Sequence, residues 1–249
     1  MDRKGGKKGQ VTLFIIIAIL IVAAGIASYF IYQKSIETRQ LSREAKVANA
    51  KNYVSEKVKE ISEGDLALTY LQGGFIDPAT YILTVRNTKI PLYLIKNNIS
   101  QPNIPTVDFL ENALEDKIKK DIEKIDLKNL SYVSSLSVED VTIELDKDSN
   151  LNVKYTILID EDDFSTIIVE EYKGTWLLNF EKMLGISKNI TKSHELMGLE
   201  INMLNLEGIS KENNVTISVD IVDPMTLVYA ISDKNPEGGM FYIAIKNET

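Results

Sequence analysis

The sequence predicts an α+β protein in which an N-terminal transmembrane helix extends into a long stem helix, followed by an ectodomain of antiparallel sheet plus helices. Three observations lead to this prediction. Residues 11–32 form an uncharged apolar run, and residues 34–62 lack proline and glycine and repeat apolar residues at helical spacing. From Val138 onward apolar and polar residues alternate, as in half-buried strands. We therefore expect four segments: a basic tail over 1–10, a transmembrane helix over 11–32, a stem over 33–64 and an extracellular domain over 65–249.

The apolar run has the length of a membrane span. A helix over residues 11–32 is roughly 33 Å long, against ~30 Å for the hydrocarbon core of a bilayer. Tyr29 and Tyr32 occupy one end, where an aromatic belt belongs, and four basic residues precede the other end. We expect a single-pass protein of the cell membrane that contacts the lipid bilayer, with a cytoplasmic N-terminus. A cleaved secretory signal ending at Gly25-Ile26-Ala27 is the alternative, although the run is longer than usual for one.

Charge and composition exclude several classes of function. The chain has 28 basic and 36 acidic residues; four of the basic residues and one acid precede the apolar run. The remaining 24 basic and 35 acidic side chains give residues 33–249 a net charge of about −11. This acidity argues against nucleic-acid binding, which needs clustered lysine and arginine. Because the chain has no cysteine, it has no disulfide, zinc–thiolate site or cysteine nucleophile. We predict no cofactor.

The N-terminal segment Lys7-Lys-Gly-Gln-Val-Thr-Leu-Phe14 resembles the class III signal peptides of archaeal type IV pilin-like proteins. The resemblance implies a prepilin-type peptidase as a partner, which would cut between Gly9 and Gln10 and leave the apolar helix on the mature protein. Many pilins carry a glutamate five residues after the cut, whereas this chain has Phe14. That departure weighs against filament assembly more than against anchoring.

A second resemblance covers more of the chain. The Gly-Gln-Val-Thr-Leu-Phe start, the long helix and the turn Leu71-Gln-Gly-Gly-Phe75 are similar to an uncharacterised group of single-pass proteins from small-genome archaea. The resemblance implies an architecture and no activity.

The predicted elements of the domain follow from periodicity and turn residues. Glu63-Gly64-Asp65 predicts a glycine-bearing break, after which residues 66–71 either extend the helix or start the globular part. Gly73-Gly74 predicts a turn, and Pro91 places the second strand of a hairpin at a sheet edge. Thr106 is expected to cap an amphipathic helix that reaches Ile125. The remaining expectations are hairpin strands over 81–85 and 90–95, a meander over 141–145, 151–159 and 164–172, a strand over 176–178, helix over 181–206 interrupted near Gly185 and Gly198, and strands over 215–222, 225–232 and 240–246.

No motif predicts catalysis or a metal site. Asp146, Asp148, Asn150 and Asn152 have the spacing of a calcium loop, but that loop's glycine and glutamate are replaced by leucine and isoleucine. A solvated turn explains them better, as it does the acidic cluster 160–163. The only histidine, His194, lacks the second histidine of a zincin motif.

Five Asn-x-Ser/Thr sequences exceed the number that chance gives, and they predict N-glycosylation on a surface domain. They begin at Asn98, Asn129, Asn189, Asn214 and Asn247.

The expected function is non-enzymatic: a pilin-like, membrane-anchored surface or envelope protein that anchors or assembles through its hydrophobic helix. Small residues at Ala23 and Ala27 would allow a homo-oligomer through that helix. The alternative is an extracytoplasmic ligand-binding or sensor module with a single transmembrane anchor. An enzyme built on a carboxylate pair is a third hypothesis, for which spacing selects no residues.

Overall fold

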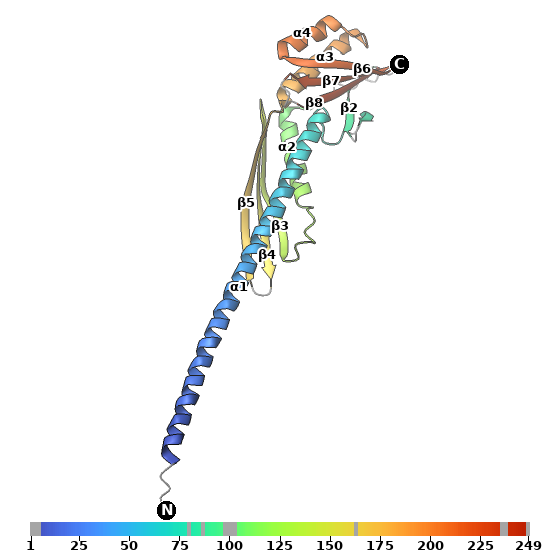
Figure 1. The fold of residues 1–249 in the computed structure, drawn as a ribbon. Helices are drawn as coiled ribbons and strands as arrows, with labels where there is room; N and C mark the ends of the chain where they lie inside the picture. The colour runs from blue at the N-terminus through green and yellow to red at the C-terminus, as the bar shows by residue number, and fades with distance from the viewer. Residues whose placement is uncertain are drawn as a thin grey trace, which may run out of the picture. The chain divides into compact units, whose positions relative to one another are not determined.

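Helix α1 (Gly6–Leu71) begins the chain and continues without interruption through the predicted stem (Figure 1). The computed structural model describes residues 6–78, 81–85, 88–96, 104–161, 164–234 and 239–247. They fall into two compact units, Met1–Ala50 and Lys51–Thr249. The break expected at Glu63-Gly64-Asp65 is wrong, because Gly64 lies inside α1, but the alternative that residues 66–71 extend the helix is confirmed. One glycine lowers helix propensity by only about 1 kcal/mol, which burial of neighbouring side chains easily outweighs.

The predicted transmembrane helix over residues 11–32 is contradicted. In the described part of the chain, no helix combines the length and the apolar composition that crossing a bilayer requires. The side chains of residues 6–25 lie outside the described residues. The predicted single-pass location in the cell membrane, with a cytoplasmic N-terminus and an extracellular domain, depended on this helix and is contradicted with it.

The part of α1 that belongs to the second unit is amphipathic. Val54, Val58, Leu66 and Tyr70 are fully or almost fully buried, and their four- and eight-residue spacings form a stripe that winds slowly around the helix. Beside this stripe, Glu63 accepts a hydrogen bond of 3.2 Å from the Tyr172 hydroxyl. Residues 51–71 of α1 are therefore part of the hydrophobic core of the second unit.

A three-stranded antiparallel sheet follows the order β3 (Val133–Leu145), β4 (Ser149–Glu161) and β5 (Phe164–Trp176), which confirms the predicted meander. The odd-numbered residues of β4 from Ser149 to Ile159 are buried. Trp176 ends β5 instead of starting a new strand, because Asn179 caps the helix that follows. Beside β3 lies α2 (Val107–Ile122), and Thr106 accepts from the Phe109 N–H at its start, as predicted.

The second sheet has the order β1-β2-β8-β7-β6, in which β2 is parallel to β8 and the other pairs are antiparallel. The hairpin and the last three strands are confirmed. The edge position expected from Pro91 is wrong, because β2 pairs with β8 as well as with β1. The bounds are Tyr81–Val85 for β1, Thr88–Lys96 for β2, Val215–Asp223 for β6, Thr226–Asp233 for β7 and Met240–Asn247 for β8.

Two helices, α3 (Phe180–Met197) and α4 (Met203–Asn213), account for the predicted helical region. The interruption near Gly198 is confirmed, since this residue caps α3 with a positive φ, whereas Gly185 lies inside the helix. The ring of Tyr70 contacts Phe180 and Phe241 edge to face, with centroids 5.0 and 5.3 Å apart. This cluster joins the end of α1 to α3 and β8.

Candidate functional site

The turn that ends α1 is shaped by two glycines with positive φ. Gly73 has φ of 62° and Gly74 of 80°, a region that residues with a Cβ rarely enter. A Cβ on Gly73 would lie 2.3 Å from the Tyr242 carbonyl oxygen. A Cβ on Gly74 would crowd Leu110 of α2 at 3.2 Å. The Gly-Gly pair therefore lets the chain reverse tightly between β8 and α2.

Hydrogen bonds and ring contacts fix this turn from within. The Tyr93 hydroxyl donates to the Gly73 carbonyl oxygen, and the rings of Phe75 and Tyr93 meet edge to face at 5.6 Å. With its amide nitrogen facing inward, Gln72 donates to the carbonyl oxygens of Phe75 and Ile76 at 2.9 and 3.0 Å. The turn consequently presents Phe75 and Ile76 at a defined position beside α2.

A pocket of about 500 Å³ lies between this turn and the first turns of α2. Its walls are mainly apolar, and the Phe109 side chain is 63% exposed at its edge. The volume lies within the range of small-ligand pockets, which are mostly apolar with a few polar groups. The lining residues that carry the apolar surface are Phe75, Ile76, Ile104, Pro105, Phe109 and Leu110.

A charged groove of about 660 Å³ adjoins the pocket, and the two share Ile76, Asp77 and Ala113. Lysines and aspartates of α2, of the segment just after it, of the turn after α1 and of β2 line the groove. Its lysines are Lys89, Lys117, Lys120 and Lys124, and its aspartates are Asp77, Asp116 and Asp121. The nearly balanced charges disfavour a purely anionic or purely cationic ligand.

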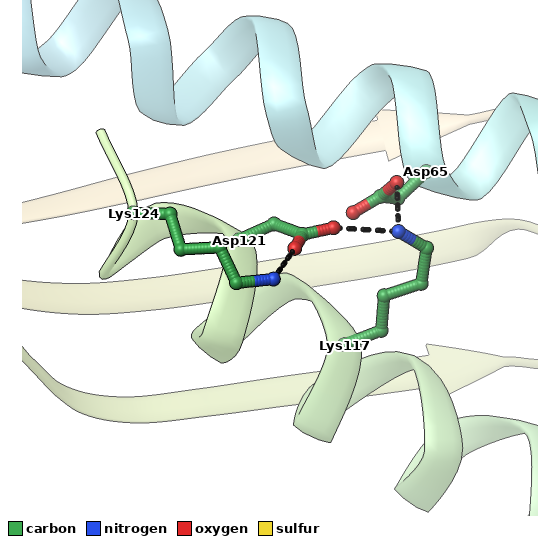
Figure 2. A network of polar contacts seen from close by, with 4 residues as sticks. All are labelled: Asp65, Lys117, Asp121 and Lys124. Atoms are coloured by element: carbon green, nitrogen blue, oxygen red, sulfur yellow. Dashed lines mark hydrogen bonds and ion pairs between the residues drawn. The ribbon is translucent and has the colours of Figure 1, made fainter. Parts of the chain in front are cut away.

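Figure 2 shows the ion-pair network along this groove. Lys117 Nζ lies 2.8 Å from Asp65 Oδ1 and 2.6 Å from Asp121 Oδ2. Lys124 Nζ contacts the other oxygen of Asp121 at 2.7 Å. The second oxygen of Asp65 is buried and has no hydrogen-bond partner among the described residues. The network thus holds α1 against α2 through one lysine.

Burial and the hydrogen bonds within the network change the pKa values of its members. Burial raises the pKa of Asp65 above its ordinary value, and the hydrogen bond from Lys117 offsets this only in part. Hydrogen bonds from Lys117 and Lys124 lower the pKa of Asp121. Burial opposes the charge of Lys117, but hydrogen bonds to Asp121 and Asp65 outweigh it and raise its pKa. The hydrogen bonds of Lys117 thus favour the charged forms of Lys117 and Asp121 and partly offset the burial of Asp65, which gives the network a structural role in positioning α2.

His194 is placed inside the core and away from this groove. It is 4% exposed, with Nδ1 2.5 Å from the Gly198 carbonyl oxygen and Nε2 2.5 Å from the Tyr229 hydroxyl. The carbonyl can only accept, so Nδ1 carries the proton and Nε2 accepts from Tyr229. Both ring nitrogens are occupied by these contacts, which makes His194 a structural residue linking α3 to β7.

The acidic turns weighed as cation sites lie apart from the pocket. Asp146 and Asp148 are exposed in the β3–β4 turn, while residues 162–163 of the other cluster lie outside the described residues. Throughout the described ranges, no group of three or more histidine, cysteine, aspartate or glutamate side chains is arranged to hold a metal ion.

The predicted processing and glycosylation positions are scattered. Gly9 and Gln10 lie within α1, and their side chains are outside the described residues, as are Asn98 and the side chain of Asn247 at the end of β8. Three other glycosylation candidates have exposed asparagines: Asn129, Asn189 and Asn214. Their surroundings differ, because Asn214 caps α4 in the left-handed conformation, whereas the Asn189 sequence ends in a threonine buried within α3.

Neither a family model, nor a curated protein, nor a solved structure matches the chain. The functional argument therefore rests on the site itself. Sequence reasoning noticed its Gly-Gly turn and its Thr106 cap, but it did not single out Phe109 or Lys117. The only sequence signal for the site was a glycine pair followed about 30 residues later by a capped helix. This signal does not indicate that the glycine turn and the helix pack against each other.

Proposed function

We propose that residues 51–249 form a non-enzymatic binding module that holds a short polypeptide segment. The apolar pocket beside α2 would take one large apolar side chain of that segment, and the adjoining groove would take its charged neighbours. The single observation that carries the proposal is the continuity of this pocket with a groove of mixed charge.

The apolar half supplies an anchor site. Phe109 is 63% exposed in the first turn of α2, beside the buried stripe that starts at Leu110. Aromatic side chains that close around an apolar anchor commonly dominate the energy of peptide recognition. Because the Gly73-Gly74 turn fixes the opposite wall, little ordering is needed on binding.

The charged half favours a polypeptide over a small ion. Lys117 and Lys124 are already paired with Asp121, and Lys89 Nζ lies 2.5 Å from Asp77. Lys120 and Asp116 make no ion pair with any described residue. A segment with charges of both signs could use these two groups, whereas a simple anion would be repelled by the aspartates beside them.

Selection of a displayed random-peptide library on the full chain tests the proposal. We expect enriched peptides to share one large apolar residue flanked by charged ones, and we expect Phe109→Asp to weaken their affinity about tenfold or more. Leu204→Asp is the matched control, because Leu204 is 82% exposed on α4 and should leave affinity unchanged. Failure to enrich any sequence, or equal effects of the two variants, would overturn the proposal.

Assembly through α1 remains a second candidate, and it is the part of the pilin-like prediction that does not depend on a membrane. Ile26, Phe30 and Ile31 are each more than half exposed on α1 of the first unit. Exposed apolar groups in a row on a helix mark interaction sites. Replacing all three by glutamine should reduce the sedimentation coefficient of the full chain if they mediate assembly.

A further inference from the structure

The two edge strands of the three-stranded sheet, β3 and β5, differ in whether another element covers them. Along β3, the N–H groups of Ile143 and Leu145 donate to Glu115 and Glu111 of α2, at 3.0 and 2.9 Å. The β3–β4 pairing also contains two register shifts. Natural sheets protect their edges with such covers and bulges. One edge of this sheet is therefore closed by α2.

The edge formed by β5 has no such protection within the described residues. Its 13 residues pair with β4 in unbroken register, and β5 is the last strand of the sheet. Residues 164–169 contain no charge and no proline. Long, uncharged and regular edge strands are templates for pairing with another strand.

The hydrogen-bond pattern shows which residues face this open edge. The Asp160 N–H donates toward β3, to Tyr132 at 3.0 Å, so odd-numbered residues of β4 are directed to β5. Their partners on β5 are even-numbered, such as Ile168 opposite Ile157. The odd-numbered residues of β5 consequently direct their backbone groups outward. Among these are Ile167 and Val169, which are 66% and 62% exposed.

We propose that β5 pairs antiparallel with β5 of a second copy of this chain and so joins two sheets into one. The strand's own sequence selects the register. With Ile167 opposite Val169 of the other copy, all four exposed apolar side chains meet and Glu171 lies opposite Ser165. Shifting the register by two residues places Ile167 opposite Glu171 or Val169 opposite Ser165, and it keeps only one of the two apolar pairs.

Cysteine pairing in the full chain tests this register, because the natural chain contains no cysteine. Directly opposed residues of a hydrogen-bonded pair have Cα atoms about 5.5 Å apart, which a disulfide can bridge. An oxidised equimolar mixture of Ile167→Cys and Val169→Cys should therefore give a covalent dimer. Each variant alone should give little, since like residues would be diagonal and roughly 7–8 Å apart.

Two further variants complete the experiment. Thr175→Cys lies on β5 outside the paired stretch and is the control for random collision. Val169→Lys should convert the dimer to a monomer in sedimentation equilibrium, whereas Thr175→Lys should not. A monomeric natural chain, equal cross-linking of mixed and single variants, or a dimer that survives Val169→Lys would overturn the proposal. The last result would indicate association through α1 or another surface.

Discussion

Lys117 Nζ lies 2.8 Å from Asp65 Oδ1 and so joins α2 to the last turns of α1 by a direct ion pair (Figure 2). The side chain of Asp65 is only 12% exposed, and its other oxygen is buried without a hydrogen-bond partner among the described residues. Asp121 shares the same lysine. The positive charge of Lys117 therefore offsets the repulsion between the neighbouring carboxylates of Asp65 and Asp121.

Replacing this lysine should destabilise the second unit. We expect Lys117→Met to lower the free energy of unfolding by about 1–3 kcal/mol, because it leaves Asp65 buried and unpaired. Urea unfolding at neutral pH measures the change. Lys119→Met is the matched control on an exposed position of α2, and its effect should stay within about 0.5 kcal/mol. Adding Asp65→Asn to Lys117→Met should restore part of the loss; a further loss would contradict this account.

The effect of Asp121 should depend on pH. Its folded-state pKa is lowered from the ordinary 3.8, so it contributes stability that is present above that pH and lost as pH falls through the folded value. We expect Asp121→Asn to be less stable than the natural chain at neutral pH, and we expect this difference to disappear once the pH falls below the lowered folded-state pKa of Asp121. Thermal unfolding across acidic pH measures the difference. A gap that stays constant with pH would show that the charge is irrelevant.

Two glycines should respond in opposite directions to alanine. Gly73→Ala should cost more than about 2 kcal/mol, because φ of 62° is unfavourable for alanine and its Cβ would collide with the Tyr242 carbonyl oxygen. Gly64→Ala should instead stabilise by about 0.5–1 kcal/mol, since Gly64 is helical and its Cβ position is open. Denaturant midpoints of both variants check the pair, and a neutral Gly73→Ala would refute the argument from the turn.

The buried histidine should matter for stability alone. We expect His194→Ala to lower the free energy of unfolding by about 2–4 kcal/mol, because it opens a cavity and leaves the Gly198 carbonyl and Tyr229 hydroxyl without their partner. Tyr229→Phe should cost less, about 1 kcal/mol, since only one hydrogen bond is lost. Chemical unfolding ranks the two variants. If Tyr229→Phe lowered the free energy of unfolding more than His194→Ala, the stabilising role of His194 through both hydrogen bonds would be contradicted.

Local sequence patterns determined most of the elements in the domain. Alternation over 141–172 gave the meander, and Thr106 with its apolar repeat gave α2, because strand and helix periods and capping residues act within a few neighbouring positions. The same patterns gave wrong predictions where contacts with segments far away in the sequence determine the local structure. Gly64 stays helical because burial of Leu66 and Tyr70 outweighs its weak propensity, and Pro91 is not at an edge because β8 arrives from the other end of the chain.

The candidate site lay beyond sequence reasoning for the same reason. Sequence alone determined the ingredients: a Gly-Gly turn, a capped helix with Lys117 and Asp121 four residues apart, and an uncharged stretch over 164–169. Only the tertiary structure decided that the turn and the helix enclose a pocket, that Asp65 reaches Lys117, and that one sheet edge is closed while β5 is left open. Such relationships depend on packing between residues far apart in the chain, and composition and periodicity carry no information about which surfaces meet.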